Sequence, residues 1–429
     1  MMNYVLAIVV SLGILAFFLL WNKPIILIYL EIIFSLSIRL FITQFGFPSF
    51  MRYIADLICL YLFLWAIVIA KRNQIKTYAF IPISILLILV IASVITFMAH
   101  DYSIGIYIEG MIKMYRYAAF YYSCIIFLNA KEVKKIIRLL FVFLVLNVIV
   151  SSIQYFLQGI RWDYNGGFFG IEVGGNGQMN VFLVITSVIG VVMGVKKKFT
   201  LIQSGAIVLG GIYIALLSEL KIYYVELLII IILCVMISKP SIRSFVYLTG
   251  GTLAIIAAIH LLGKMYPLFA DFFNPKTILN YTNNDKYGGG TGNLNRLTAL
   301  PYVYKNLLKT PVDKWIGIGI GNANDGTVFH SKYKNLKYNW FFSSYYTVEN
   351  GLLCFILYCM FFISITVSCI YFMQRDSENK EYYLISAVIS LFPIIFMIYD
   401  GSLLTLVSYV LFLILSLPFI IYREKARIT

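Results

Sequence analysis

Residues that can bind an anion are concentrated in a glycine-rich polar stretch, 158–178, which interrupts an otherwise hydrophobic sequence. It contains seven glycines, and Arg161 and Trp162 stand at its head. Backbone N–H groups of a glycine-rich segment can form a concave anion site, and the planar guanidinium group of arginine suits phosphate. A flexible tether whose arginine and tryptophan lie at the level of the lipid head groups would have the same composition. The stretch therefore indicates either a phosphate site or an interfacial anchor.

A second polar stretch, 264–347, is the longest hydrophilic part of the chain. It holds ten lysines and arginines against four aspartates, which gives it a net charge of +6. A basic surface of this kind attracts an anionic head group or an acidic polymer, although the same charges would also solubilise an exposed loop. For the scattered lysines we prefer the second interpretation.

A short amphipathic helix is predicted within this stretch, over 295–308. Its apolar positions recur at helical spacing, at Leu297, Leu300, Tyr304, Leu307 and Leu308. Asn293 or Asn295 can cap the helix, and Pro311 is expected to end it before a tight turn that contains Gly317, Gly319 and Gly321. Arg296 then stands at the start of the helix, where a cation opposes the helix dipole. That placement favours a role for Arg296 in binding an external anion.

Three further ionisable residues, His100, Lys113 and Arg116, lie near the ends of hydrophobic segments. Burial of such groups in lipid is costly, so we expect them to face a cavity or the interface. For Lys113 the alternative is that its long side chain extends to the head groups. Aromatic residues in the polar stretches, Trp162 among them, are suited to stack on sugar rings through their apolar faces.

The segments that must position these residues are strongly hydrophobic. Of 429 residues, 61% are hydrophobic and 12% are charged, and the mean hydropathy is +0.88, whereas a soluble domain carries about 25% charged residues. The sequence therefore predicts an all-α polytopic membrane protein, one membrane domain over 1–429, with 12–13 spanning helices of roughly 20 residues each. The candidate spans are 3–20, 24–41, 53–70, 78–98, 107–128, 136–157, 179–195, 199–217, 221–237, 243–263, 348–373, 381–399 and 402–422.

The short loops predict the orientation of these spans. Every second loop is basic, as is typical of loops on the cytoplasmic side; these loops contain 71–76, 131–138, 196–198, 239–243, 375–380 and 423–427. The stretches 158–178 and 264–347 are then predicted to face outward, the second as one large outward loop. The segment 3–20 has no basic residue before it, so we expect a retained helix rather than a signal peptide. The side of the N-terminus depends on whether there are 12 or 13 helices and stays open.

Several classes of function are not indicated. All six cysteines lie inside predicted spans, and the sequence has no CxxC pair, P-loop or HExxH motif. We therefore expect no metal site and no cofactor. The net charge of +15 is mostly the orienting charge of the cytoplasmic loops and indicates no nucleic-acid partner.

The order of motifs over 155–365 resembles that of the O-antigen polymerase and O-antigen ligase superfamily. Arg161 is followed, after fifteen residues, by Gly177, and Asn180 then enters the next helix. Lys221 stands in a short turn where relatives often have arginine, and it keeps the cation but lacks the bidentate fork. The C-terminal part of the resemblance consists of Arg296 before an apolar helix, Pro311, the Gly317–Gly321 turn and a helix that opens at Glu349-Asn350-Gly351-Leu352.

This resemblance implies a metal-independent membrane glycosyltransferase with a GT-C-like fold. It would lie in the bacterial cytoplasmic (inner) membrane with its active site facing outward. Its donor would be a glycan chain on undecaprenyl diphosphate, and its acceptor a sugar hydroxyl of another lipid-linked repeat unit. The reaction would lengthen a polysaccharide of the O-antigen or capsule type, in the same pathway as a flippase and a chain-length regulator, which are expected partners along with the lipid bilayer.

The predicted site follows from that reaction. Departure of the lipid diphosphate builds negative charge, which Arg161 and Arg296 would stabilise as catalytic residues. The acceptor hydroxyl needs a proton acceptor or an orienting group. His330 is suited to this role because histidine titrates near neutral pH. Tyr338 lies nearer the position at which ligases of the superfamily have a histidine. The further alternatives for this role are Glu172 and Glu219, and the predicted substrate-binding residues are Lys113, Arg116, Trp162, Gly177, Asn180 and Lys221.

Two other functions share part of this pattern. A ligase that transfers finished glycan to another acceptor has the same fold and much of the same site. A flippase or transporter of lipid-linked sugars is expected to place its charges along a central path, whereas the charges here cluster toward one face. The sequence therefore favours the polymerase, and it does not determine the sugars or the linkage.

Overall fold

The computed structural model describes residues 20–73, 77–100, 102–237, 242–266, 296–323 and 341–428, and the regular secondary structure in these ranges is helical. Within them, nine helices are long and apolar enough to cross a membrane. The chain is therefore a multi-pass membrane protein, as its composition predicts. The nine spans are α2 (Pro24–Phe45), Ser49–Asn73 with α3 (Tyr53–Asn73), α4 (Phe80–Ala99), Ala130–Leu157 with α6 (Ala130–Ser152), α7 (Gly175–Val195), α10 (Ile242–Met265), α14 (Phe342–Arg375), Lys380–Tyr399 with α15 (Lys380–Ile389) and α16 (Phe392–Tyr399), and Val407–Ala426 of α17 (Val407–Ile428).

Three more helices correspond to predicted spans but are shorter or more charged. They are α5 (Ile104–Phe127), α8 (Leu201–Leu217) and α9 (Lys221–Ile237). The first predicted span, 3–20, lies outside the described residues apart from Leu20. The total of 12–13 spanning helices therefore stays a prediction.

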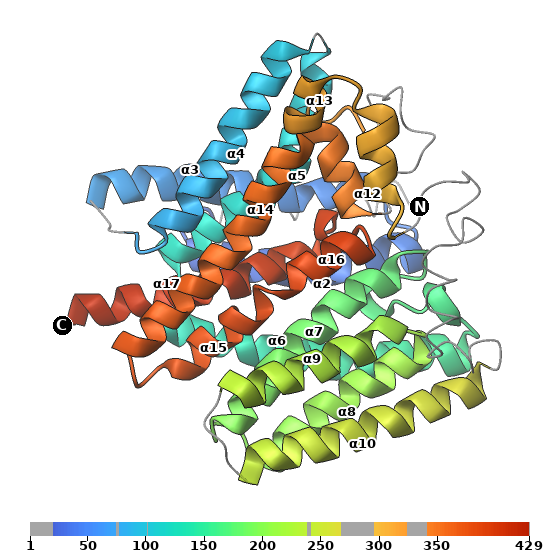
Figure 1. The fold of residues 1–429 in the computed structure, drawn as a ribbon. Helices are drawn as coiled ribbons and strands as arrows, with labels where there is room; N and C mark the ends of the chain where they lie inside the picture. Colours follow the sequence, from blue (N-terminus) through green and yellow to red (C-terminus); the bar gives the residue numbers. More distant parts are fainter. Residues whose placement is uncertain are drawn as a thin grey trace.

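The centre of the bundle is formed by α7, which is largely apolar and is buried along nearly its whole length. It packs against α8 and α9 on one side and against α15 and α17 on the other. Figure 1 shows α7, α8, α9 and α10 side by side, with α4, α5 and α14 in the other half of the molecule. Because α17 contacts both α5 and α7, it joins the two halves.

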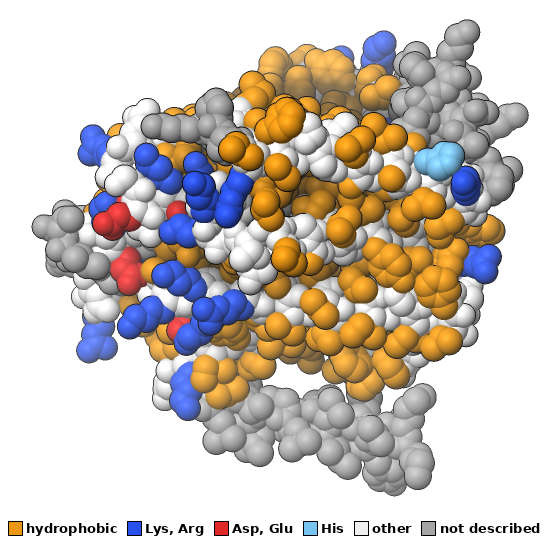
Figure 2. Space-filling model, turned by 90° about the horizontal axis from the view of Figure 1, so that it is seen from below, with side chains coloured by type: hydrophobic (Ala, Val, Ile, Leu, Met, Phe, Trp, Pro, Cys, Tyr) orange, Lys and Arg blue, Asp and Glu red, His pale blue; other side chains and the backbone are white. Residues whose placement is uncertain are grey.

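The described parts of the loops predicted to be cytoplasmic lie together at one end of the bundle, which we call the basic end (Figure 1). Two ion pairs connect them, since Lys198 lies 2.8 Å from Glu381 and Lys425 lies 2.8 Å from Asp376. Figure 2 shows lysine and arginine side chains gathered at one end of a face that is otherwise largely apolar. The grouping agrees with the predicted alternation of loops, and the side of the membrane that this end faces stays a prediction.

The opposite end, which we call the Arg296 end, carries the loops 158–174 and 218–220, the segment 296–323 and the turn 400–406. The predicted helix over 295–308 is shorter here, because α12 (Ala299–Tyr302) continues only through the π-helical residues Val303–Leu307. Its buried residues are Ala299 and Val303, whereas Leu297 is half exposed, so the predicted apolar face was partly wrong. Asn293 and Asn295 lie outside the described residues.

Pro311 begins a helix, and the prediction that it ends the preceding one was wrong. It is the first residue of α13 (Pro311–Ile316), and proline is favourable there because the N–H at that position has no partner within the helix. Thr310 caps the helix, accepting a hydrogen bond from the Asp313 N–H at 3.0 Å, while the Asp313 carboxylate accepts the Thr310 N–H at 3.2 Å. After the described part of the predicted outward loop, α14 begins at Phe342, earlier than expected.

Candidate functional site

The glycine-rich loop is bound to the helices beneath it at several points. Gln154 donates to the Gly167 carbonyl at 3.0 Å and accepts from the Gly167 N–H at 2.8 Å. The Arg39 guanidinium donates to the Val173 carbonyl at 3.2 Å, and Phe169 is buried. These contacts show an ordered loop rather than a flexible tether, and they fix the point at which α7 begins.

Gly177, in the first turn of α7, faces the turn between α16 and α17. A Cβ atom at this position would lie 2.9 Å from Asp400 Oδ2 and 3.0 Å from Ser402 Oγ. Ordinary van der Waals contacts are made at roughly 3.5–4.0 Å. The absence of a side chain at residue 177 therefore lets the Asp400 carboxylate approach the α7 backbone.

Asp400 is a half-buried carboxylate held by two connections. Its Oδ1 accepts the Ser402 N–H at 2.8 Å, and its backbone carbonyl accepts the N–H of Phe342, the first residue of α14, at 2.9 Å. Burial raises the pKa of Asp400, while hydrogen bonds from Ser402 and the nearby positive charge of Arg296 oppose that rise. The carboxylate is thus fixed in place beside a cation.

Arg296 and Lys221 bring two positive charges to the same place. The Arg296 guanidinium lies over the Tyr399 ring, 4.4 Å from its centroid, and its charge acts on both Asp400 and Lys221. The Lys221 ammonium pairs with Glu219 at 2.8 Å, so part of its charge is neutralised. Burial raises the pKa of Glu219, and its bond to Lys221 opposes that rise. Of the five lysines and arginines predicted for the site, the structure therefore brings Arg296 and Lys221 within electrostatic range of each other.

Arg161 lies at the edge of this group. Its guanidinium is exposed and lies 5.3 Å from the centroid of the Tyr155 ring. The charges of Arg161 and Glu219 both act on Tyr266, which places Arg161 at the same end of the bundle as the Glu219–Lys221 pair. Trp162 is 55% exposed and has a φ of 59°, a backbone conformation unusual for a residue other than glycine.

Asn180 lies beneath this surface rather than on it. Its side-chain amide donates to Glu226 at 2.8 Å, and both residues are fully buried. Asn180 Oδ1 and Glu226 Oε1 have no hydrogen-bond partner among the described residues. The charge of Asp400 acts on Glu226, so the two carboxyl groups lie within electrostatic range of each other. Asn180 is therefore placed to support the site from below, and direct contact with a donor is not indicated.

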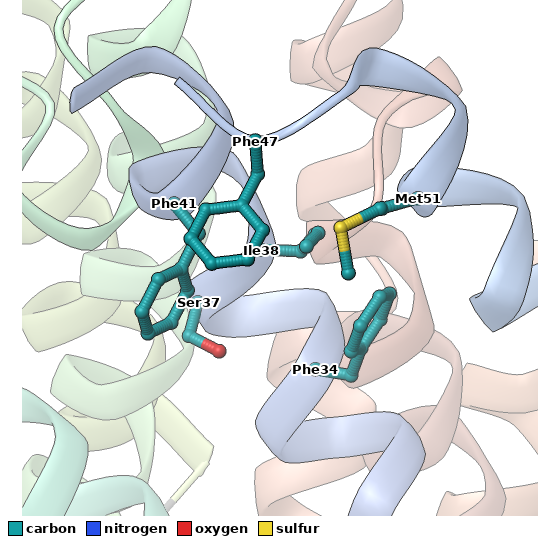
Figure 3. Close-up of a pocket in the computed structure, with 6 residues that line it drawn as sticks. All are labelled: Phe34, Ser37, Ile38, Phe41, Phe47 and Met51. Carbon is teal, nitrogen blue, oxygen red and sulfur yellow. The ribbon is translucent and has the colours of Figure 1, made fainter. Parts of the chain in front are cut away.

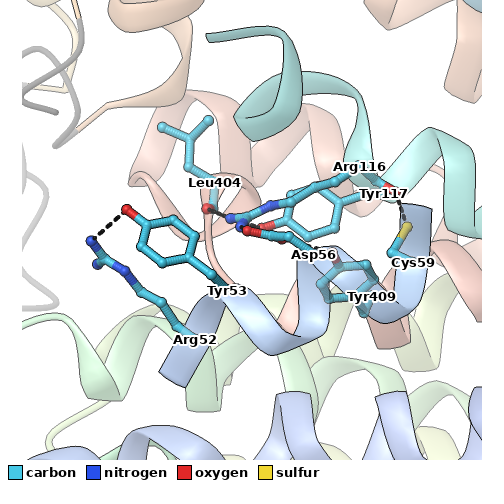
Figure 4. A network of polar contacts seen from close by, with 8 residues as sticks. All are labelled: Arg52, Tyr53, Asp56, Cys59, Arg116, Tyr117, Leu404 and Tyr409. Carbon is cyan, nitrogen blue, oxygen red and sulfur yellow. Dashed lines mark hydrogen bonds and ion pairs between the residues drawn. The ribbon is translucent and has the colours of Figure 1, made fainter. Parts of the chain in front are cut away.

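Arg116 lies in a separate buried network, which Figure 4 shows. Its guanidinium donates to both carboxylate oxygens of Asp56, at 2.9 and 3.1 Å, and to the Leu404 carbonyl at 2.9 Å. The Tyr409 hydroxyl donates to the same carboxylate at 3.0 Å. Because Asp56 neutralises this cation inside the bundle, we leave Arg116 out of the candidate site.

Lys113 belongs to a third group, at the break in α14. Its ammonium lies 5.3 Å from the centroid of the Tyr345 ring, and the charge of Glu349 acts on it. Glu349 is fully buried, and its Oε1 accepts the Ala323 N–H at 3.1 Å. The predicted role of Lys113 in substrate binding stays a prediction.

The glycine turn packs against that same break. The N–H groups of Ile318 and Gly319 donate to the carbonyls of Val348 and Glu349, at 2.9 and 3.1 Å. Gly351 has φ 73° and ψ 177°, which only glycine adopts readily, and a Cβ there would meet the Trp315 carbonyl. The motif that carried the family resemblance is thus a backbone-to-backbone junction in this structure.

The lining of the apolar pocket in Figure 3 includes no residue of the three groups of charges. It has a volume of about 190 Å³ and is lined by residues of α2 and of the turn that follows, namely Phe34, Ser37, Ile38, Phe41, Phe47 and Met51. No charged side chain lines it. It offers no group for the predicted chemistry.

Three residues of the site were missed by sequence reasoning: Asp400, Glu226 and Tyr399. For Asp400 and Glu226 the available signal was an acidic residue inside or directly after an apolar run, since such residues are costly in a membrane and usually functional or paired. His330 and Tyr338 lie outside the described residues, so their predicted roles stay predictions. In the described part of the chain no three His, Cys, Asp or Glu residues are grouped as metal ligands, and the metal-independent reaction also stays a prediction.

Comparison of the chain with protein-family models and with curated protein sequences gives no match.

Proposed function

We propose that this chain is a polymerase of lipid-linked polysaccharide repeat units, of the O-antigen or capsule type, in a bacterial inner membrane. It transfers the growing glycan from undecaprenyl diphosphate to a sugar hydroxyl of another lipid-linked repeat unit at the outer face. The observation that carries this proposal is that Arg296 lies within electrostatic range of both Lys221 and Asp400 at one end of a membrane-spanning bundle.

The two cations suit the leaving group of this reaction. When the bond between the sugar and the lipid diphosphate breaks, negative charge grows on the phosphate oxygens. Positively charged donors that are already held in place stabilise that charge without reorganising. Arg296 is held over Tyr399 and Lys221 is held by Glu219. Arg161, exposed at the edge, is suited to bind the diphosphate as it enters.

The position of the site suits a lipid-linked substrate. The cations lie at the ends of helices whose apolar surfaces face the bilayer, so a diphosphate at the head-group level reaches them while its isoprenoid chain stays in lipid. Trp162 is exposed beside them and can stack on a sugar ring.

Deletion of the gene in its bacterial source tests this function. We expect the surface glycan to shorten to single repeat units that are still attached to their acceptor, and complementation with the intact gene to restore long chains. Loss of all attached glycan would indicate a ligase instead. Accumulation of lipid-linked units on the cytoplasmic side would indicate a flippase, and either result would contradict the polymerase.

The same complementation assay tests the role of Arg296. Arg296→Ala removes a charge-stabilising donor, which typically costs about 2.7–4 kcal/mol of barrier, or roughly 10²–10³ in rate. Arg296→Lys is expected to be impaired as well, because a point charge does not replace the planar fork. Arg375→Ala is the matched control, since Arg375 also lies over a tyrosine ring, 4.5 Å from the Tyr371 centroid, but at the basic end. Equal activity in the Arg296→Ala and Arg375→Ala variants would remove Arg296 from the site.

A further inference from the structure

The reaction proposed above leaves one chemical requirement open, the destination of the proton of the attacking hydroxyl. We infer that the Asp400 carboxylate accepts this proton, which makes Asp400 a catalytic residue at the acceptor sugar. The inference rests on the proposed function and adds to it a residue from the turn between α16 and α17.

Asp400 has the geometry that a proton acceptor needs. One carboxylate oxygen is fixed by the Ser402 N–H at 2.8 Å, and the other lies toward Gly177. The backbone of the same residue is anchored to Phe342 at the start of α14. These bonds hold the carboxylate in one orientation in a residue that is only half-buried. A base that is held in place is more effective than a freely rotating one.

The charges around Asp400 suit both the acceptance of the hydroxyl proton and the departure of the diphosphate. Arg296 acts on Asp400 and on Lys221, so its guanidinium lies within electrostatic range of both the carboxylate and the second cation. Burial makes Asp400 a stronger base than an exposed aspartate, because its pKa is raised. Glu226 and Asn180, fully buried below, each have one oxygen without a hydrogen-bond partner among the described residues. Glu226 lies within electrostatic range of Asp400 and adds a polar group beneath it.

The step balances without any further reactant. The oxygen of the acceptor hydroxyl forms a bond to C1 of the donor sugar, and the bond from C1 to the diphosphate oxygen breaks with its electron pair moving to the diphosphate. The hydroxyl proton passes to the Asp400 carboxylate, which becomes a carboxylic acid and later releases the proton to water. The charge that departs with the diphosphate is stabilised by Arg296 and Lys221.

Other described carboxylates at this end are less suited to the role. Glu219 is paired with Lys221 at 2.8 Å, and Glu226 is fully buried and bound to Asn180. Asp163 is exposed and accepts a hydrogen bond from Asn176 at 2.7 Å. Glu172 lies on the far side of the loop, where its charge acts on Arg39.

Substitution of Asp400 in the full-length protein in lipid nanodiscs tests the inference. Turnover is measured with lipid-linked repeat units from the deletion strain, and binding is measured with undecaprenyl diphosphate. We expect Asp400→Asn to lower turnover by about a hundredfold or more, as removal of a general base typically does, with binding unchanged. Asp400→Glu should retain intermediate turnover. Asp163→Asn, which changes an exposed acid at the same end, should remain as active as the unchanged protein.

Chemical rescue distinguishes a catalytic role of Asp400 from a structural one. Asp400→Ala is expected to regain turnover when formate is added, because a small carboxylate can accept the proton in the vacated space. Formate cannot restore a displaced loop. Asp400→Asn with unchanged turnover, or with binding lost in proportion to turnover, would overturn the inference. Neither result would affect the proposed function, which fails only if the unchanged protein does not lengthen the glycan.

Discussion

Replacement of Gly177 by alanine tests how closely α7 and Asp400 must approach each other. Gly177 has an ordinary helical backbone, so alanine fits the helix and favours it by about 1 kcal/mol. The new Cβ, however, would lie 2.9 Å from Asp400 Oδ2 and 3.0 Å from Ser402 Oγ. To reach a normal contact near 3.5 Å, the carboxylate and its turn must move by roughly half an ångström.

Stability and activity are expected to respond very differently to this movement. Overpacking typically costs about 1–3 kcal/mol, and the helix propensity of alanine offsets about 1 kcal/mol of that, so the net loss of folding free energy is about 0–2 kcal/mol. Misplacement of a reacting group by about 1 Å can lower a rate by about a hundredfold, so half that movement predicts a loss of roughly tenfold. Turnover should therefore fall much more than the melting temperature suggests.

The assay compares chain elongation and thermal unfolding of three alanine variants at equal protein amounts. Gly250→Ala adds the same atom to a helix where nothing lies within 4 Å, and it should change neither quantity. Gly211→Ala overpacks α8 against the Tyr223 hydroxyl away from the site, and it should lower stability but leave turnover per folded molecule intact. Normal turnover in Gly177→Ala, or a loss that simply follows its stability as in Gly211→Ala, would refute the reasoning.

Three further predictions concern the rest of the molecule. Burial alone would raise the pKa of Asp376, but hydrogen bonds from Lys425, Asn379 and Tyr383 outweigh it and hold that pKa at about 2, below its ordinary 3.8. Asp376→Asn should therefore lower the unfolding free energy by about 1 kcal/mol above pH 4, a figure that allows for solvent screening. In thermal melts, the difference between this variant and the unchanged protein should vanish as the pH falls toward 2. Asp56→Ala leaves Arg116 buried without its carboxylate and should lower the unfolding free energy by about 3–5 kcal/mol, measured as loss of folded protein. The double variant Asp56→Ala, Arg116→Leu should recover part of that loss. No recovery would contradict the ion-pair account. Val173 and Lys135 are exposed positions at opposite ends of the bundle. An impermeant maleimide applied from outside should label a cysteine substituted at Val173 but not one substituted at Lys135. The reverse result would invert the topology.

The helices of this chain could be predicted well from hydrophobicity, because a span long enough to cross a bilayer leaves an unmistakable apolar run. Helix ends were harder to predict. Proline can follow a helix or begin one, and only the reciprocal bonds of Thr310 and Asp313 show that Pro311 does the latter. The face of the short helix before it also depends on packing against α14, which spacing alone does not reveal.

The candidate site could be predicted only in part. Arg296 was recognisable from its place at the start of a predicted helix and Lys221 from its place in the order of motifs, and the structure brings them within electrostatic range of each other. Arg116 has the same residue type and a similar setting, yet it is neutralised by Asp56, a pairing between two helices that the sequence does not reveal. Asp400 was missed for the same reason, since its significance comes from contact with Gly177, which is distant in the chain.

The most direct measurement is chain elongation by the purified protein in lipid nanodiscs, given only lipid-linked single repeat units and analysed by mass spectrometry. The account predicts lipid-linked chains of two or more repeats together with released undecaprenyl diphosphate, without added nucleotide or metal. The products should be abolished or strongly reduced in Arg296→Ala and retained in Arg375→Ala. Folded protein that binds the lipid-linked unit and leaves it at a single repeat would contradict the proposed polymerase.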